Sequence, residues 1–161
     1  MNWQEVCDDP LLRNLPYKIE LNEWGNIVIS PATSQHSFLQ GLIQDALRRI
    51  REDGFFYKEC PIQTSKGVKV ADVAWASDEF VRMHGRKSPL QRAPELCVEV
   101  LSPSNSPQEM EEKRELYFAR GAQEVWLCDE QGALRFYDCT GEIPASRLFP
   151  GINHIESEYL H

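Results

Sequence analysis

Two acidic residues lie inside the most apolar stretches of the chain. Asp72 interrupts the run Val-Lys-Val-Ala-Asp-Val-Ala-Trp-Ala, Glu99 interrupts Glu-Leu-Cys-Val-Glu-Val-Leu, and both runs have the composition of buried strands. A carboxylate removed from water is costly unless it is paired or bound to a cation, and neighbouring carboxylates also repel each other. A divalent metal removes both costs, because hard cations prefer oxygen ligands. The pattern predicts a divalent cation held by Asp72 and Glu99, and the alternative is that a buried Arg or Lys neutralises each acid.

Lys113 lies on a predicted helix that begins a few residues after Glu99. It stands three residues after Met110 and four before Tyr117, in the middle of the apolar face of that helix. The alternative is a lysine whose stem covers apolar surface while its ammonium reaches water. Two carboxylates, a metal ion and an ammonium could hydrolyse a phosphodiester, because the metal polarises the phosphate and activates water while the lysine stabilises developing charge.

The order of periodic segments predicts one α/β domain of the mixed α+β type over residues 1–161, with an N-terminal hairpin, a central mixed sheet and two flanking helices. Residues 1–16 and 140–161 are expected to be an irregular lead-in and an irregular tail. Strands are predicted at 17–21, 27–30, 55–60, 68–76, 95–101, 124–129 and 134–139. One helix should follow the caps Thr33 and Ser34 and end before Gly54, and another should run from Pro107 to about Arg120.

A basic segment lies between two of the predicted strands. Residues 82–92 contain no acid and carry the four cations Arg82, Arg86, Lys87 and Arg92. The segment could be a solvated loop or a loop that grips phosphate. The net charge of −8 argues against a surface that binds nucleic acid non-specifically, because phosphate affinity depends on Lys and Arg.

The composition is that of a globular protein expected in the cytoplasm. No run approaches the roughly 20 apolar residues of a membrane helix, and the acidic N-terminus lacks the pattern of a signal peptide. The five cysteines are widely spaced and form no C-x-x-C pair, which argues against a zinc site or a disulfide framework.

At this point the sequence resembles a known family, the Uma-type putative restriction endonucleases of the PD-(D/E)XK nuclease superfamily. The most specific part is Ala-Pro-Glu-Leu-Cys-Val-Glu-Val-Leu-Ser-Pro-Ser at residues 93–104, followed by Glu112-Lys113 and Tyr117. The resemblance covers nearly the whole chain and also includes residues 69–76, Ile29-Ser30-Pro31-Ala32, His36, Leu116, Gly121, Val125-Trp126-Leu127 and Phe149-Pro150-Gly151.

The resemblance implies a restriction-endonuclease-like core with a Mg²⁺ (or Mn²⁺) site. Asp72 matches the Asp of the superfamily motif, Glu99 matches its second acid, and the backbone carbonyl of Val100 would be a further ligand. Two positions depart from the motif: Ala71 replaces its proline, and Leu101 stands where its lysine belongs. Lys113 is the natural replacement for that lysine.

Three further residues are weaker candidates for the site. Glu20 could add a carboxylate to the site, but an edge-strand acid that faces water is the favoured interpretation. His36 opens a helix, where a histidine is more often a surface or capping residue than a catalyst. Glu95 begins its strand and is expected to be exposed.

The leading hypothesis is a magnesium-dependent endonuclease that acts on DNA. One alternative is a nuclease fold retained as a binding or regulatory module without turnover, and another is a metal-dependent hydrolase of RNA or of a smaller phosphodiester. A homodimer would suit a small nuclease that must reach two strands, although this is an analogy.

Overall fold

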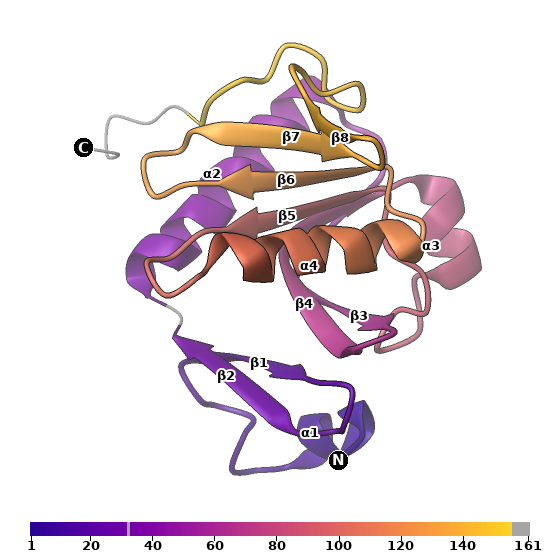
Figure 1. Ribbon diagram of the computed structural model, residues 1–161. Helices are drawn as coiled ribbons and strands as arrows, with labels where there is room; N and C mark the ends of the chain where they lie inside the picture. Colours follow the sequence, from indigo (N-terminus) through magenta and orange to yellow (C-terminus); the bar gives the residue numbers. More distant parts are fainter. Residues whose placement is uncertain (32, 156–161) are drawn as a thin grey trace.

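The structure is a computed structural model that describes residues 1–31 and 33–155 (Figure 1). The helices are α1 (Trp3–Asp8), α2 (Ser34–Ile50), α3 (Asp78–His84) and α4 (Pro107–Ala119). The strands are β1 (Tyr17–Leu21), β2 (Ile27–Pro31), β3 (Phe55–Thr64), β4 (Gly67–Ala76), β5 (Leu96–Val100), β6 (Glu124–Cys128), β7 (Leu134–Asp138) and β8 (Gly141–Ile143).

A six-stranded sheet in the order β3-β4-β5-β6-β7-β8 forms the body of the molecule. Neighbouring strands are antiparallel except β5 and β6, which are parallel and are joined by α4 as a crossover. Figure 1 shows α4 in front of the sheet and α2 behind it. The helix α4 is therefore placed directly over the central strands.

Strand alternation divides the buried side chains between two cores. Behind the sheet, the apolar face of α2 packs against one set of side chains from β4 and β5. In front, Tyr117 of α4 belongs to a second core with Ala74 and Cys97. Glu99 is two residues from Cys97 and turns toward α4, where it contacts Lys113 and Tyr117, whereas Asp72 contacts His36 and Gln40 of α2.

The strands β1 and β2 form a separate antiparallel hairpin, below the sheet in Figure 1. Gly25 supplies its turn with a φ of 77°, a backbone conformation that glycine adopts at little cost. Leu21 of the hairpin packs with Val6 of α1 and Val68 of β4. This small apolar cluster docks the N-terminal segment onto the sheet.

The predicted fold class is confirmed, but both expectations of irregular ends are wrong in part. The lead-in contains α1, because Asn2 accepts a hydrogen bond from the Glu5 amide while the Glu5 carboxylate accepts one from the Asn2 amide. The tail contains β8, which pairs with β7, and it places Phe149 in the core. Ala32 and the last six residues of the expected tail, 156–161, lie outside the described residues.

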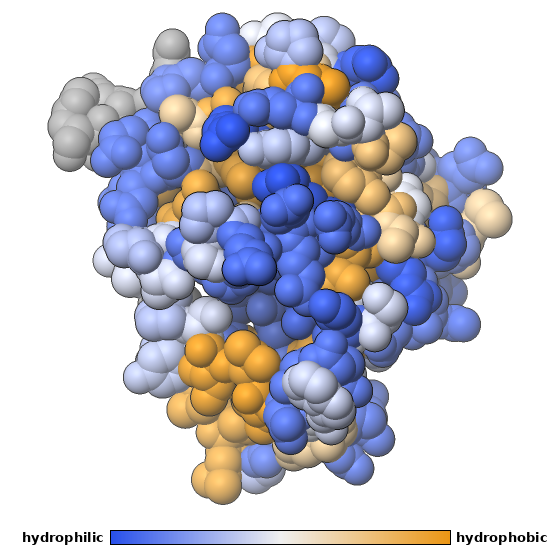
Figure 2. Space-filling model, viewed as in Figure 1, coloured by the Kyte–Doolittle hydropathy of each residue, from blue (hydrophilic) through white to orange (hydrophobic). Residues whose placement is uncertain are grey.

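The surface is mostly polar over the sheet, and apolar side chains gather over the hairpin (Figure 2). Val28 and Ile29 of β2 are 39% and 49% exposed. Across the two described ranges, every helix is too short or too polar to cross a membrane.

Candidate active site

Asp72 and Glu99 lie where the pairing of β4 with β5 ends. The last paired residues are Val73 and Val98, and the same register would place Asp72 opposite Glu99. Here the Val100 amide donates to the Asp72 side chain instead, with 2.7 Å between N and Oδ2. The open end of the ladder leaves both carboxylates between the strands, with side-chain exposures of only 1% and 3%.

Two lysines join three carboxylates into a continuous chain of charges. Lys113 Nζ lies 2.8 Å from Glu20 Oε2 and 3.2 Å from Glu99 Oε1. Lys18 Nζ lies 2.9 Å from Glu99 Oε2 and 3.1 Å from Asp72 Oδ1. This charge chain runs Glu20, Lys113, Glu99, Lys18, Asp72, with opposite charges adjacent throughout. Because all five side chains are buried, neighbours rather than water must compensate each charge.

Neutral donors complete the surroundings of the carboxylates. The Tyr117 hydroxyl donates to Glu99 Oε1 at 2.7 Å, and Gln40 Nε2 lies 3.4 Å from Asp72 Oδ1. The Val70 amide donates to Glu20 Oε2 at 2.6 Å. Each acid is thus held by a cation and by a group from a strand or helix, which fixes its orientation.

His36 joins the first turn of α2 to the end of β5. The Thr33 hydroxyl caps α2 by accepting from the His36 amide, which fixes the start of the helix. The ring nitrogen Nε2 lies 3.1 Å from the Val100 carbonyl oxygen and 3.4 Å from Asp72 Oδ2. The hydrogen bond with Asp72 raises the pKa of His36, and burial opposes this only in part.

The charge chain shifts the pKa of its members in different directions. Burial raises the pKa of Glu99, and Lys113 and Lys18 oppose this only in part. Burial acts in the same direction on Asp72 and Glu20, but neighbouring groups together outweigh it and lower the pKa of both acids. These groups are chiefly Lys18 and His36 at Asp72, and Lys113 and Lys18 at Glu20. Burial would lower the pKa of Lys18, but Glu99 and Asp72 hold it well above its usual value. Glu99 is therefore the acid in the chain that protonates most readily.

Replacement of His36 by Gln should destabilise the metal-free protein more at about pH 5.5 than at about pH 8.5. The pKa of His36 is raised above 6.5 in the folded protein, so the stability that its protonated form contributes is fully present below that value and is lost as the pH rises through the folded-state pKa. Urea unfolding of both proteins in the presence of a chelator measures the two differences. Equal differences at the two pH values would contradict a charged His36–Asp72 pair.

The structure brings the predicted trio Asp72, Glu99 and Lys113 together. Lys113 reaches Glu99 from the inward face of α4, so the alternative of an ammonium in water is wrong. The interpretation of Glu20 as an acid that faces water is also wrong, since it is 4% exposed and pairs with Lys113. His36 follows the cap of α2 but contacts Asp72 and is more than a surface residue.

Glu95 is the remaining residue that departs from expectation. It is partly buried, and its carboxylate accepts from the Ser77 amide at the start of α3. It therefore anchors α3 and takes no part in the charge chain.

Two members of the site, Lys18 and Gln40, are not among the residues predicted from the sequence. Lys18 precedes Glu20 by two residues, the spacing that places both on one face of β1. Gln40 follows His36 by four residues, one turn along α2. Both signals become visible only if Glu20 and His36 are first assigned to a buried site.

The basic residues of segment 82–92 lie at the other end of β5. Arg82 belongs to α3 and not to a loop, and Arg92 lies beside Gly121, just after α4. Figure 1 shows α3 on the opposite side of the sheet from the loop that follows β5. Among the residues placed by the structure, no hydrogen bond or ion pair links Arg82, Arg86, Lys87 or Arg92 to Asp72 or Glu99. Their contact with nucleic acid stays a prediction.

The donors around Asp72 and Glu99 suit a hard divalent cation. The Lys18 ammonium shows that a cation can sit between Asp72 Oδ1 and Glu99 Oε2. Within residues 1–31 and 33–155, no group of three or more His, Cys, Asp or Glu is arranged to hold a metal ion. The protein's ligands would therefore be the two carboxylates and the Val100 carbonyl. Such a small set suits Mg²⁺, which usually keeps several water ligands when it binds a protein.

A hollow of about 320 Å³ borders the site between the start of α2 and the loop after β5. Its lining includes His36 and Val100, the two residues that touch Asp72 from the outside. Asp72 and Glu99 do not line the hollow themselves, so His36 and Val100 lie between it and the carboxylate pair.

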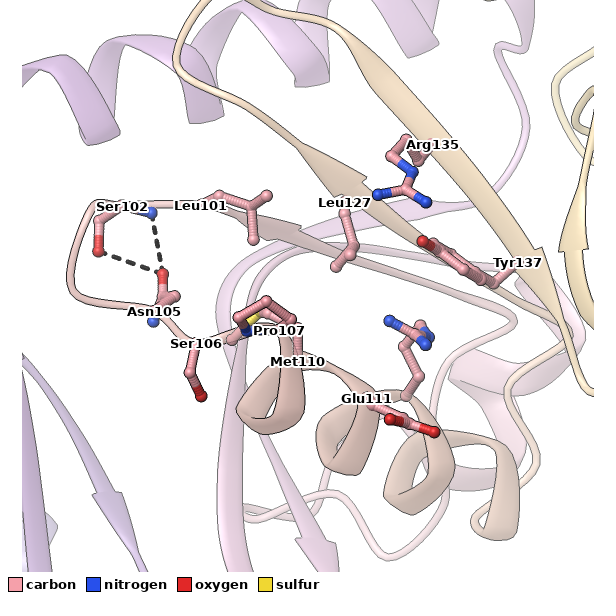
Figure 3. Close-up of a pocket in the computed structure, with 11 residues that line it drawn as sticks. Leu101, Ser102, Asn105, Ser106, Pro107, Met110, Glu111, Leu127, Arg135 and Tyr137 are labelled. Atoms are coloured by element: carbon pink, nitrogen blue, oxygen red, sulfur yellow. Dashed lines mark hydrogen bonds between the residues drawn. The ribbon is translucent and has the colours of Figure 1, made fainter.

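A second hollow of about 330 Å³ lies on the other side of the same loop, against α4, β6 and β7 (Figure 3). Its lining includes Leu127 and Tyr137 but no member of the charge chain. The loop between the hollows is fixed by its own bonds, because the Ser102 amide and hydroxyl both donate to Asn105 Oδ1, at 2.9 and 3.1 Å. The two hollows are thus separate features of the surface.

Comparisons with known proteins identify the family of the chain. The family Uma2, described as "Putative restriction endonuclease", matches residues 3–141, a range that contains the whole charge chain. The crystal structure of a putative nuclease belonging to DUF820 from Anabaena variabilis ATCC 29413 is similar in fold, with a TM-score of 0.67 and 18% sequence identity over 84% of this chain and 85% of that chain. Among curated proteins, none matches the sequence. The family match confirms the resemblance seen in the sequence: the chain belongs to the Uma2 putative restriction endonuclease family.

Proposed function

We propose that the protein is a magnesium-dependent endonuclease that hydrolyses phosphodiester bonds in DNA. The observation that carries this proposal is the pair Asp72 and Glu99, buried at the open end of the β4–β5 ladder and already sharing one cation, the Lys18 ammonium. Membership of a restriction endonuclease family supports a nuclease. The dependence on magnesium and the choice of DNA as substrate go beyond the family and require a test.

Asp72, Glu99 and the Val100 carbonyl would hold the cation, and Mg²⁺ or Mn²⁺ bound there would supply Lewis-acid chemistry, polarising the phosphate and making water more acidic. Lys113 takes the role of the lysine absent at Leu101, and its ammonium stabilises negative charge that develops on the phosphate oxygens.

Three neutral or acidic partners position these groups and do not act on the substrate directly. Glu20, at 2.8 Å from Lys113 Nζ, orients the ammonium. The Tyr117 hydroxyl holds one oxygen of Glu99, which leaves the other oxygen turned toward Asp72. The His36 ring contacts both the Val100 carbonyl and Asp72, and so fixes their positions relative to each other. Such preorganisation matters because small displacements of catalytic groups reduce rates strongly.

DNA would approach through the hollow beside His36 and Val100. The net charge of −8 weakens long-range attraction to a polyanion, so affinity for substrate would depend mainly on contacts at the site itself. Cleavage is therefore expected to be more sensitive to the metal than to the salt concentration alone.

Cleavage assays test the proposal directly. Wild type, Glu99→Gln and the control Glu115→Gln, an exposed acid on α4, are incubated with single- and double-stranded DNA and RNA in Mg²⁺, Mn²⁺ or a chelator. We expect DNA cleavage by wild type and Glu115→Gln with either metal, and none by Glu99→Gln or in chelator. Cleavage that persists in chelator, or in Glu99→Gln, would contradict the proposed site, and cleavage of RNA alone would replace DNA as the substrate.

A binding module without turnover is a second candidate, favoured by one observation. Lys18 already neutralises the carboxylate pair, so the site is satisfied without a metal ion. A module of this kind would bind DNA in gel-shift assays, leave it intact, and give no calorimetric signal with Mg²⁺ or Mn²⁺.

A further inference from the structure

We propose that the Lys18 ammonium occupies the cation position of the site in the metal-free protein and must withdraw before a divalent cation can bind. The inference rests on the proposed metal site and adds a competitor for it within the same chain. It makes Lys18 a residue that sets metal affinity and not a catalytic residue.

The contacts of Lys18 identify the position. Its Nζ touches one oxygen of Asp72 and one oxygen of Glu99, at 3.1 and 2.9 Å, so these two oxygens share a single cation. The other oxygen of each acid is held from the opposite side: Glu99 Oε1 by Lys113 and Tyr117, and Asp72 Oδ2 by the Val100 amide. A cation bridging the two acids would have to stand where Nζ now stands.

The net charge of the site favours a divalent cation that replaces the Lys18 ammonium over one that binds beside it. Three carboxylates and two ammoniums leave the charge chain with one net negative charge when His36 is neutral. A divalent cation added beside Lys18 would make the cluster net positive and would place two cations in contact in a buried space. The same cation in place of Lys18 leaves the cluster neutral, which is the cheaper state in a medium of low dielectric.

A hollow next to Lys18 could receive its side chain after withdrawal. A third hollow of about 320 Å³ lies between the N-terminal segment, β1 and the β3–β4 pair, and its lining includes Lys18, Arg13, Glu59 and Val70. Glu59 stands at the rung of β3 opposite Asp72 where pairing is interrupted, and its φ of 49° is in the left-handed region. Its exposed carboxylate borders the hollow, so a withdrawn ammonium would find both space and an acidic partner there.

Calorimetric titration with MnCl₂ tests the inference without any measurement of activity. The variants are Lys18→Met, which removes the charge at similar length, and the control Lys58→Met, an exposed lysine on β3. Lys18→Gln keeps a hydrogen-bond donor at the carboxylates and replaces Lys18→Met if that variant is unfolded by circular dichroism. Thermal unfolding with and without Mn²⁺ provides a second readout, because a ligand that binds only the folded state raises the melting temperature.

We expect the neutral Lys18 variant to bind Mn²⁺ at least about tenfold more tightly than wild type, because breaking a buried ion pair costs more than the ~1.4 kcal/mol that corresponds to a tenfold change. Its melting temperature should be lower than that of wild type without metal and should rise more when Mn²⁺ is added. Lys58→Met should match wild type in both measurements.

The possible failures are distinguishable. Equal or weaker Mn²⁺ binding by the neutral Lys18 variant, relative to wild type, would overturn the competition while leaving the proposed metal site in place. Absence of binding by both proteins would overturn the metal site itself, and the inference with it. Binding by the neutral variant alone would support the inference in its strongest form, with Lys18 excluding the metal from wild type.

Discussion

Asp72→Asn should reduce metal-dependent DNA cleavage by at least about a hundredfold, since even the outer partners of metal ligands are typically worth 10- to 100-fold. The substitution removes the charge that the metal requires and retains the shape of the side chain. The amide oxygen of Asn can still accept from the Val100 amide, which Asp72 binds at 2.7 Å, so this link between β4 and β5 should remain. Initial rates of cleavage at saturating Mg²⁺, together with circular dichroism, measure both effects.

Asp45→Asn is the matched control for this experiment, because Asp45 is an exposed acid on α2. It should cleave as wild type does. Wild-type rates in Asp72→Asn would be incompatible with a metal held by this carboxylate. A loss of native circular dichroism in the variant would instead assign Asp72 mainly to stability.

Lys113→Met should reduce the free energy of unfolding by roughly 3 kcal/mol, the lower end of the range for removing one partner of a buried ion pair. Among the residues that the structure describes, Lys113 is the one cation within hydrogen-bond reach of Glu20, so Glu20 then keeps only the Val70 amide. Glu99 keeps Lys18 and Tyr117, which is why the larger values of the range are not expected. Urea unfolding of the metal-free protein at neutral pH measures the loss, and cleavage should fall in parallel under conditions where the variant is folded.

Lys66→Met provides the contrast, because Lys66 pairs with Glu112 at 3.0 Å in an exposed ion pair. Exposed pairs contribute little to stability, so this variant should unfold close to wild type. A Lys113→Met protein as stable as Lys66→Met would show that Glu20 and Glu99 are compensated by other means. Comparison of the two variants thus shows whether the loss of stability depends on burial of the ion pair or on pairing alone.

The acids of the central strands could be predicted from the sequence because their signal is local. Asp72 and Glu99 interrupt apolar runs, and strand alternation places Glu99 on the same face as Cys97. Lys113 was predictable for the same reason, since helical spacing fixes its face of α4. The register that brings the two acids opposite each other follows only from the pairing of β4 with β5.

The contribution of β1 could not be predicted in this way. Its sequence Tyr-Lys-Ile-Glu-Leu alternates as an exposed edge strand would, and nothing local shows that its polar face is buried as well as its apolar face. Burial of Lys18 and Glu20 results from docking of the hairpin on β4, a tertiary contact between distant segments. Their opposite charges make this burial tolerable only because the charge chain compensates them.

Glu124 shows why a buried acid does not by itself predict a metal. It lies in β6, within the apolar run Glu-Val-Trp-Leu-Cys, and it is 3% exposed. Its oxygens accept from Trp126 Nε1 and the Ser146 hydroxyl, and from the amides of Arg147 and Leu148. Neutral donors satisfy this carboxylate completely, and it fastens the segment after β8 to the sheet. Glu99 differs from it by its lysine neighbours, which sequence spacing reveals for Lys113 but not for Lys18.

The docked hairpin has a consequence for how the molecule behaves as a unit. Its polar face supplies Lys18 and Glu20, while the partners of both come from the body of the protein. Detaching the hairpin would leave charges without partners on both surfaces at once, so we expect the N-terminal segment and the candidate site to unfold as one cooperative unit. A truncation or fusion that loosens the first strand should therefore also disturb Asp72 and Glu99, which stand many residues later in the chain.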